Sequence, residues 1–261
     1  GLYYGYSGID RHEHDKRRGF SVRCLRDDTI YGCTDSLATN YNPEADFDDG
    51  SCEYPDNGDY SLSFDGVDDY VIFENFNNYN YTQFSLEMWF KWNGINGEQW
   101  QFLLSHGFGN NNSILIEIMD DGMLRSNMNY TESRIDTFIL DNEWYHYAMV
   151  FDGSNMTVFL NGQIVETVDA NTPNTINQPL SLGGLALYPD DYPLNGEIKG
   201  FKFSDNVEYT EYFSIDNLND YEACIVCSGF SAGSGTTLYD HSGNQNHGDI
   251  NGATWEENIY G

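Results

Sequence analysis

Basic residues are scarce in this chain. Only 11 of its 261 residues are lysine or arginine, against 42 aspartate or glutamate, so the formal net charge at pH 7 is −31. A surface of this sign repels phosphate backbones and anionic lipid headgroups. The balance therefore excludes nucleic acid and anionic membrane as expected partners, and it favours cations.

Long apolar runs are missing too. No stretch reaches the roughly 18 apolar residues that a membrane-spanning helix requires, so we expect no membrane insertion. Hydrophobic residues nevertheless make up 39% and aromatic residues 16% of the chain, which is too much for a disordered acidic protein. A folded core is predicted. No signal peptide is visible, yet Gly1 stands inside a strand-rich segment, so we expect the natural chain to begin upstream.

Cysteine is also infrequent, but its spacing is informative. Cys33 and Cys52 bracket a loop rich in Asp and Asn, and Cys224 and Cys227 form a C-x-x-C. We predict a disulfide within each pair and an oxidising, extracellular setting. A thioredoxin-like redox pair needs a βαβ context, and a zinc site needs a second pair at ligand spacing; neither is present. Cys24 is left without a partner in this pairing, and we expect its partner in the chain upstream of residue 1.

Residues 1–27 hold six of the eleven basic residues. Their string R-G-F-S-V-R-C-L-R-D resembles the closing strand of the Fibrobacter succinogenes major paralogous domain, a cysteine-containing module of secreted bacterial proteins. The resemblance implies that 1–27 is the C-terminal fragment of an upstream secreted domain.

Residues 31–54 form a separate small unit. Their sequence, YGCTDSLATNYNPEADFDDGSCEY, resembles a short Cys/Asp-rich repeat found between domains of secreted marine bacterial proteins. A disulfide that closes the 18 residues between Cys33 and Cys52 is worth about 3 kcal/mol in the chain-entropy model. The neighbouring Asp46, Asp48 and Asp49 are candidate calcium ligands, although the closing Glu of an EF-hand is missing. The alternative is an acidic solvated turn.

Residues 57–226 show the pattern of an all-β domain. Gly, Asn and Asp recur between runs of alternating polarity, which is typical of a sandwich. In FSLEMWFKW the alternation places Phe84, Leu86, Met88, Phe90 and Trp92 on one face, and Ser85, Glu87, Trp89 and Lys91 on the other. Asn161-Gly162 predicts a two-residue type I′ turn between two strands.

Several phrases of this region, in their order, resemble the laminin-G-like, concanavalin-A-like jelly roll: SLSFDGVDDYVIF, FSLEMWFKW, EWYHYAMVFDGSNMTVFLNGQIV and PLNGEIKGFKFSDN. The resemblance implies a two-sheet antiparallel jelly-roll sandwich from an extracellular family that often binds calcium and often accompanies glycan-processing enzymes or adhesins. The chain departs from the family at GEIKGFKF, because many relatives carry an acidic residue where Lys199 or Gly200 stands; the resemblance therefore implies no metal ligand from this strand. Residues 227–261 either supply the closing strand or begin a second copy.

A hydrolase activity is not expected from the carboxylates. A retaining mechanism needs two carboxyl groups about 5 to 5.5 Å apart. Glu117 and Asp120 are the nearest candidates, but a spacing of three turns them to opposite faces of a strand. The six histidines, His12, His14, His106, His146, His241 and His247, stand apart from any nucleophile motif, and we interpret them as surface or core imidazoles.

The main metal prediction concerns a loop near the C-terminus. Asp240, Ser242, Asn244 and Asn246 place side-chain oxygens at alternate positions, a spacing that suits calcium. The same residue types also form ordinary turns. Asp65, Asp68 and Asp69 in FDGVDDY are weaker candidates, with a turn between strands as their alternative.

Ligand-binding candidates are the aromatic residues of loops, since binding residues of sandwiches collect there or on a concave face. Tyr188 and Tyr192 flank Asp190 and Asp191, and Trp100 ends another loop. A sugar ring can stack on such rings while carboxylates bond its hydroxyls. The alternative is that these tyrosines only close the edge of the sandwich.

Together these patterns predict a non-catalytic extracellular binding or adhesion module of a longer secreted or surface bacterial protein. Its partner is expected to be a glycan or another cell-surface component, its ion structural Ca²⁺, and its neighbours further domains of the same chain. A purely structural, calcium-stabilised spacer and a divergent glycan hydrolase are the alternatives.

Overall fold

The structure is a computed structural model. It describes residues 29–76, 81–95, 97, 99–107, 113–129, 133–173, 175–185, 188, 191–215 and 224–258. The predicted domain fragment 1–27, Cys24 and Asp190 lie outside these residues.

The regular elements of the described residues are strands. They are β1 (Tyr31–Gly32), β2 (Phe47–Asp48), β3 (Tyr60–Asp65), β4 (Tyr70–Phe73), β5 (Phe84–Trp92), β6 (Trp100–His106), β7 (Ile114–Met119), β8 (Met123–Met128), β9 (Ser133–Phe138), β10 (Trp144–Phe151), β11 (Asn155–Leu160), β12 (Gln163–Asp169), β13 (Leu180–Leu182), β14 (Asn195–Ser204), β15 (Val226–Ser228), β16 (Thr237–Leu238), β17 (Gly248–Asn251) and β18 (Thr254–Glu257). In this part of the chain no helix has the length and apolarity needed to cross a membrane.

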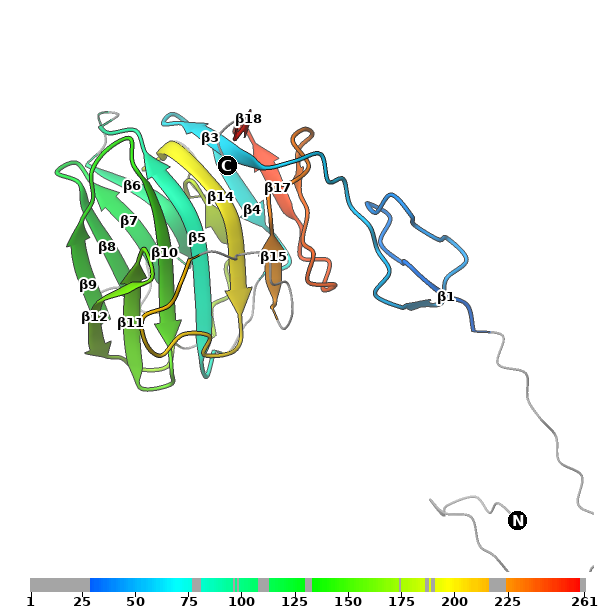
Figure 1. The fold of residues 1–261 in the computed structure, drawn as a ribbon, viewed down its shortest axis with the longest axis horizontal. Coiled ribbons are helices and arrows are strands. Elements are labelled where there is room, and N and C mark those ends of the chain that lie inside the picture. The colour runs from blue at the N-terminus through cyan, green and yellow to red at the C-terminus, as the bar shows by residue number, and fades with distance from the viewer. Residues whose placement is uncertain are drawn as a thin grey trace, which may run out of the picture.

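Two antiparallel sheets form the sandwich (Figure 1). The first sheet has the order β12-β11-β10-β5-β14-β3-β18, with β15 paired to β14. The second sheet has the order β16-β17-β4-β13-β6-β7-β8-β9. The predicted two-sheet antiparallel sandwich is therefore confirmed.

Side-chain alternation on β5 builds the core between the sheets. Its predicted inner residues all belong to one buried cluster that includes residues of both sheets: Phe84, Leu86, Met88, Phe90 and Trp92. The other face of β5 points out of the sandwich, so the predicted assignment of faces is confirmed. Since β5 lies between β10 and β14, its outward residues stand in the middle of the first sheet.

The predicted hairpin joins β11 to β12. Asn161 and Gly162 both have positive φ, 51° and 73°, as a type I′ turn requires. A Cβ on Gly162 would overlap the carbonyl oxygen of Phe213. Glycine is needed here both for the turn and because a later segment of the chain passes over it.

The segment after residue 224 adds strands to both sheets. β15 pairs with β14 and β18 with β3 in the first sheet, while β17 pairs with β4 in the second. This pairing is what is expected if 227–261 closes the sandwich. The sequence-based domain boundaries themselves stay a prediction.

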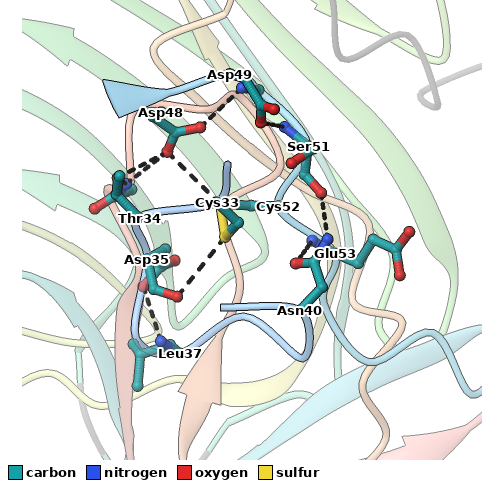
Figure 2. The surroundings of a disulfide bond; sticks show 12 residues. Cys33, Thr34, Asp35, Leu37, Asn40, Asp48, Asp49, Ser51, Cys52 and Glu53 are labelled. Atoms are coloured by element: carbon teal, nitrogen blue, oxygen red, sulfur yellow. Dashed lines mark hydrogen bonds between the residues drawn. A yellow bond between two sulfur atoms is a disulfide. The ribbon is translucent and has the colours of Figure 1, made fainter. Parts of the chain in front are cut away.

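A disulfide and short-range hydrogen bonds hold the Cys/Asp-rich repeat together (Figure 2). Cys33 is bonded to Cys52, with their Cα atoms 4.7 Å apart, and Cys224 is bonded to Cys227, so both predicted pairings are confirmed. The parallel pair β1–β2 adds only two residue pairs. So small a unit buries little apolar surface, and the cross-link compensates for that.

The repeat is attached to the sandwich by a contact that we call the latch: Tyr54, Asp35 and His247. The Oδ2 atom of Asp35 accepts a hydrogen bond from the Tyr54 hydroxyl at 2.7 Å. The same oxygen lies 2.7 Å from His247 Nε2. The backbone N–H of Asp240 donates to His247 Nδ1 at 2.9 Å. Because an N–H can only donate, Nδ1 is unprotonated and Nε2 carries the proton towards Asp35.

Ring contacts extend the latch. The Tyr54 ring stacks on Tyr239 at 5.2 Å and meets His241 and His247 edge-on. Next to it, the Gln245 side chain donates to Asp48 Oδ2 at 3.1 Å. Figure 1 shows the repeat on the same side of the sandwich as β15 and β17.

Replacement of Gly183 by alanine is expected to destabilise the sandwich. Gly183 has φ 79°, and a Cβ would overlap the buried ring of Phe64, so we expect a cost of about 2 kcal/mol or more from overpacking. The matched control is Gly235→Ala, since Gly235 has φ 85° and open space around it. Chemical denaturation of both variants measures the difference, and equal losses would contradict the overlap.

Acid is expected to loosen the latch. Burial opposes ionisation of Asp35, but the Leu37 amide, the Tyr54 hydroxyl and His247 outweigh it and lower the pKa of this carboxyl. A lowered pKa stabilises the folded state above the unfolded value of about 3.9 and ceases to do so as pH falls through the folded value. Amide exchange of residues 29–54, corrected for intrinsic rates, should therefore rise below about pH 4.

The variant Asp35→Asn should show the same exchange already at pH 7. Asp49→Asn is the control, because the Asp49 side chain is exposed. Full protection of residues 29–54 in Asp35→Asn would show that this carboxylate does not hold the repeat.

Candidate functional site

A groove of about 950 Å³ lies on the outer face of the first sheet. Its floor carries Trp89 from β5, Trp144 from β10 and Lys199 from β14. We call it the tryptophan groove. Both tryptophan side chains are half-buried, and they point outward because their neighbours along each strand face the core.

Strand register brings these side chains together. Trp89 is paired with His146 on one side and with Lys199 on the other, and Trp144 is paired with Lys91. The Lys199 Nζ atom lies 5.0 Å from the Trp144 ring centre and 6.0 Å from that of Trp89. Cation–π attraction in this arrangement holds the indoles in place.

A bulge in β14 shapes the floor next to Lys199. The register moves from Lys199 opposite Trp89 to Phe201 opposite Met88, so that Gly200, with φ 59°, is the extra residue. Bulges increase local twist and redirect side chains near binding sites. Lys199 and Gly200, where the chain departs from its family resemblance, thus lie in the groove.

Residues 205–215 cover the other part of the same outer face. Tyr209 and Phe213 stack at 3.7 Å and pack on Ala148, Val150 and Phe159. The Tyr209 hydroxyl donates to Glu87 at 2.7 Å. This cover explains why Glu87 is buried although it points away from the core. The described part of the cover reaches the groove, where Ile215 contributes to the lining.

One wall of the groove comes from the end of the repeat and the linker to β3. Glu53, Asp56 and Asp59 line it and are exposed. The Asp59 carboxylate lies 3.9 Å from Lys199 Nζ. The groove therefore offers aromatic faces on its floor and carboxylate acceptors on its wall.

The C-terminal segment completes the groove with Gly229, Ser231 and His241. Burial lowers the pKa of the His241 imidazole, although the charges of Asp240 and Asp56 oppose this. The lowered pKa keeps the ring neutral near pH 7, so it can both donate and accept a hydrogen bond.

The predicted loop site is only partly assembled. Trp100 and Tyr192 lie together, with ring centres 5.7 Å apart, and Tyr192 also packs on Phe102 in a small cluster with Leu115 and Leu185. Tyr188 is 53% exposed and Asp191 is exposed as well. Ligand binding by these residues stays a prediction.

The loop 240–246 converges on a carboxylate. Asp240 is fully buried, and its two oxygens accept hydrogen bonds from the Cys227 amide, the Ser242 amide and hydroxyl, and the Asn246 amide, all between 2.7 and 2.9 Å. The side-chain amides of Asn244 and Asn246 donate to carbonyls of the C-x-x-C segment. These bonds account for the spacing as a loop-forming pattern, and calcium at this loop stays a prediction.

The acidic loop of the repeat uses its carboxylates in a similar way. Asp46, Asp48 and Asp49 each accept a nearby backbone N–H. The Gly50 amide is the main cause of the lowered pKa of Asp48. The bond from Gln245 to Asp48 also brings two predicted calcium loops together, although they are about 200 residues apart in sequence.

The turn between β3 and β4 differs from the loop 240–246 and from the acidic loop of the repeat. Within the described residues, Asp65, Asp68 and Asp69 form a group whose ligand atoms all lie within 4.8 Å of one another. Burial raises the pKa of Asp69, and the charges of Asp65 and Asp68 raise it further, partly offset by a hydrogen bond from the Asp65 amide. Carboxylates crowded in this way could hold a divalent cation, which would relieve their repulsion.

The hydrolase candidates are separated. Glu117 is buried on β7, where it accepts hydrogen bonds from Arg125 and Asn127, while Asp120 is exposed in the following turn. Burial raises the pKa of Glu117, although the interactions with Arg125 and Asn127 lower it. Arg125 also pairs with Asp136, so its guanidinium bridges the carboxylates of Glu117 and Asp136.

The histidines of the described residues fit the predicted structural roles. His106 is buried beside Tyr81, with Nε2 2.8 Å from the hydroxyl, and burial lowers its pKa to about 4. His146 is buried 3.3 Å from Glu87, His247 belongs to the latch, and His241 lines the groove. His12 and His14 lie outside the described residues.

Trp89 and Trp144 were not among the sequence-based candidates. The pattern that could have indicated Trp89 is its place on the polar face of FSLEMWFKW, where a large apolar ring has no core to enter. Trp144 precedes a strand with the same alternation. Their partners on the wall could not be inferred, because they come from a different segment of the chain.

Comparison with known proteins places the chain by fold. The family model described as "Concanavalin A-like lectin/glucanases superfamily" matches residues 65–208. No curated protein sequence matches significantly. A crystal structure of a putative carbohydrate binding protein from Bacteroides ovatus has a TM-score of 0.58 at 14% identity, covering 80% of this chain and 62% of that protein. The chain thus spans less than two thirds of that relative.

Two other structures are similar with lower TM-scores. Domains LG4-5 of the mouse laminin alpha1 chain give 0.44 at 14% identity, with 59% of this chain and 45% of that one covered. The CBM40 of a Ruminococcus gnavus sialidase, bound to alpha2,3 sialyllactose, gives 0.43 at 16% identity, with 57% and 92% covered. The family model covers more than half of the sequence, and the chain therefore belongs to the concanavalin A-like lectin/glucanases superfamily.

Proposed function

We propose that this chain is a non-catalytic extracellular binding module and that it takes a glycan in the tryptophan groove. One observation carries the proposal: two outward tryptophan rings on adjacent strands share a groove of about 950 Å³ with carboxylate side chains. The apolar face of a sugar ring stacks on an indole, while its hydroxyls donate to carboxylates.

Charge narrows the class of glycan. The groove is lined by Glu53, Asp56 and Asp59 but by one lysine, Lys199, which already lies near Asp59. A ligand with carboxylate or sulfate groups would meet repulsion from this wall and from a chain of net charge −31. Neutral glycans are therefore the expected ligands.

The loop of Trp100, Tyr188, Asp190, Asp191 and Tyr192 is the second candidate place for the same ligand. The groove is favoured because the Trp100 and Tyr192 rings pack against each other, whereas the two rings of the groove line an open space. The resemblance to a putative carbohydrate binding protein agrees with either place, since it concerns the fold alone.

The two disulfides and the acidic surface suit an extracellular position on a longer secreted or surface bacterial chain. Structural Ca²⁺ is part of the proposal. Of the predicted calcium ligands, Asp65, Asp68 and Asp69 are the best supported by geometry, because their carboxylates crowd one another.

Glycan binding should depend on the floor of the groove. On an array of neutral and acidic oligosaccharides, we expect the unaltered chain to bind neutral ones, and Trp89→Ala or Trp144→Ala to cost about 2 kcal/mol, roughly a thirtyfold loss of affinity. Calorimetric titration with the strongest neutral oligosaccharide measures it.

Matched controls separate the two places. Trp100→Ala and Tyr188→Ala should bind like the unaltered chain; if these variants lose binding and the groove variants keep it, the site is the loop. No binding to any glycan would favour a structural spacer. Hydrolysis of a bound oligosaccharide that stops in Glu117→Gln would instead show a hydrolase.

Calcium should raise the melting temperature. An ion bound only by the folded state stabilises it by about 2.7 kcal/mol at 100 times its dissociation constant, which corresponds to several degrees, on the order of 5 °C. Magnesium at equal ionic strength controls for screening.

Variants then locate the ion. Asp68→Asn should remove the calcium response, since Asp68 is exposed and its loss leaves the core unchanged. Asp240→Asn should lower stability with or without calcium because it breaks the hydrogen-bonded loop. Identical melting curves in chelator, magnesium and calcium would refute structural calcium.

A further inference from the structure

The Cys/Asp-rich repeat takes part in the groove. From Cys52 to Asp59 the chain supplies one wall, although these residues lie outside the matched family region 65–208. The floor belongs to the sandwich. The groove therefore exists only while the repeat and its linker stay docked.

The position of this wall is fixed at two places. At its start, the latch joins Tyr54 to Asp35 and His247, and all three are shielded or partly shielded from solvent. At its middle, the Asn57 amide donates to the Ser231 carbonyl at 2.8 Å, and its side chain donates to the Ala232 carbonyl at 2.7 Å. Between these anchors lies Asp56, with Asp59 just beyond them.

The latch is well suited to set this position. Hydrogen bonds to a charged, buried acceptor such as Asp35, which is 5% exposed, are stronger and more geometrically demanding than neutral surface ones. The disulfide from Cys33 to Cys52 connects the residues beside Asp35 to those beside Tyr54. A displacement of the repeat is thereby passed directly to the wall.

We infer that the repeat is a working part of the binding site, and that Asp35 and His247 act as positioning residues: through their contacts with Tyr54, which belongs to the wall, they set the wall and with it the affinity for a neutral glycan. The role in glycan affinity rests on the proposed function. The docking of the repeat on the sandwich does not depend on that function. A repeat that served only as a spacer would leave affinity independent of the latch.

The test uses the full chain and two readouts. Tyr54→Phe keeps the ring that stacks on Tyr239 and removes only the hydroxyl that bonds Asp35. Tyr41→Phe is the matched control: Tyr41 belongs to the same repeat, is 43% exposed and does not line the groove. A second variant, Cys33→Ser with Cys52→Ser, opens the repeat without altering the floor.

The first readout is hydrogen exchange of residues 53–59, and the second is affinity for the neutral oligosaccharide that binds the unaltered chain most strongly. We expect faster exchange and an affinity loss of about fivefold or more in Tyr54→Phe, from one lost bond to a charged group, and a larger loss in the double variant. The melting temperature of the sandwich should change little in Tyr54→Phe.

Each outcome decides a different statement. Unchanged affinity in both variants overturns the role of the repeat in binding while the glycan function stands. If the unaltered chain binds no neutral glycan, the proposed function fails, and hydrogen exchange of residues 53–59 alone tests the docking. Unchanged exchange in Tyr54→Phe and in the double variant then overturns the latch as well. Faster exchange supports it.

Discussion

Strict alternation along the central strand β5 is the constraint on which the rest depends. Five large apolar side chains enter the core from one face, and this fixes the register against β10 and β14 over almost the whole strand. A slip by one residue would exchange the faces. Trp89 is therefore held outward, in the middle of the first sheet, by the burial of its neighbours Met88 and Phe90. The floor of the groove is a consequence of core packing.

An outward face in the middle of a sheet must be covered or kept polar, and this chain does both. Residues 205–215 cover the part with Ala148 and Val150, where apolar side chains would otherwise meet water. Further along, Lys91 and Lys199 stand over the Trp144 ring and Lys199 also over that of Trp89, and residues of the repeat line the same groove. Among the described residues, Ile215 of the cover and residues of the wall segment 52–59 both line the space above the tryptophan rings. Within the part of the chain that the structure describes, the groove lies between these two segments.

The fold was predictable from sequence because it depends on local patterns. The alternation of polar and apolar residues predicted the two faces of β5, and Asn161-Gly162 predicted the hairpin turn. The spacing of the cysteines predicted both disulfides. The groove was not predictable in the same way, because its wall and floor come from segments joined by long-range contacts such as that of Asp35 with His247. Loop composition directed attention to Tyr188 and Trp100 instead, and single-strand alternation cannot show which outward rings another segment will border.

The acidic residues show why composition alone does not assign metal ligands. Asp, Asn and Ser at alternate positions converge oxygens on a cation, but they converge equally well on backbone N–H groups. What separates the two cases is the supply of donors. Asp240 has four protein donors and is the centre of its loop. Around Asp69, one backbone amide of the described residues donates to a carboxylate that faces two others, and burial together with the charges of Asp65 and Asp68 raises the pKa of Asp69. Repulsion that hydrogen bonds do not relieve is the physical feature that favours a cation at the β3–β4 turn over the loop at 240–246.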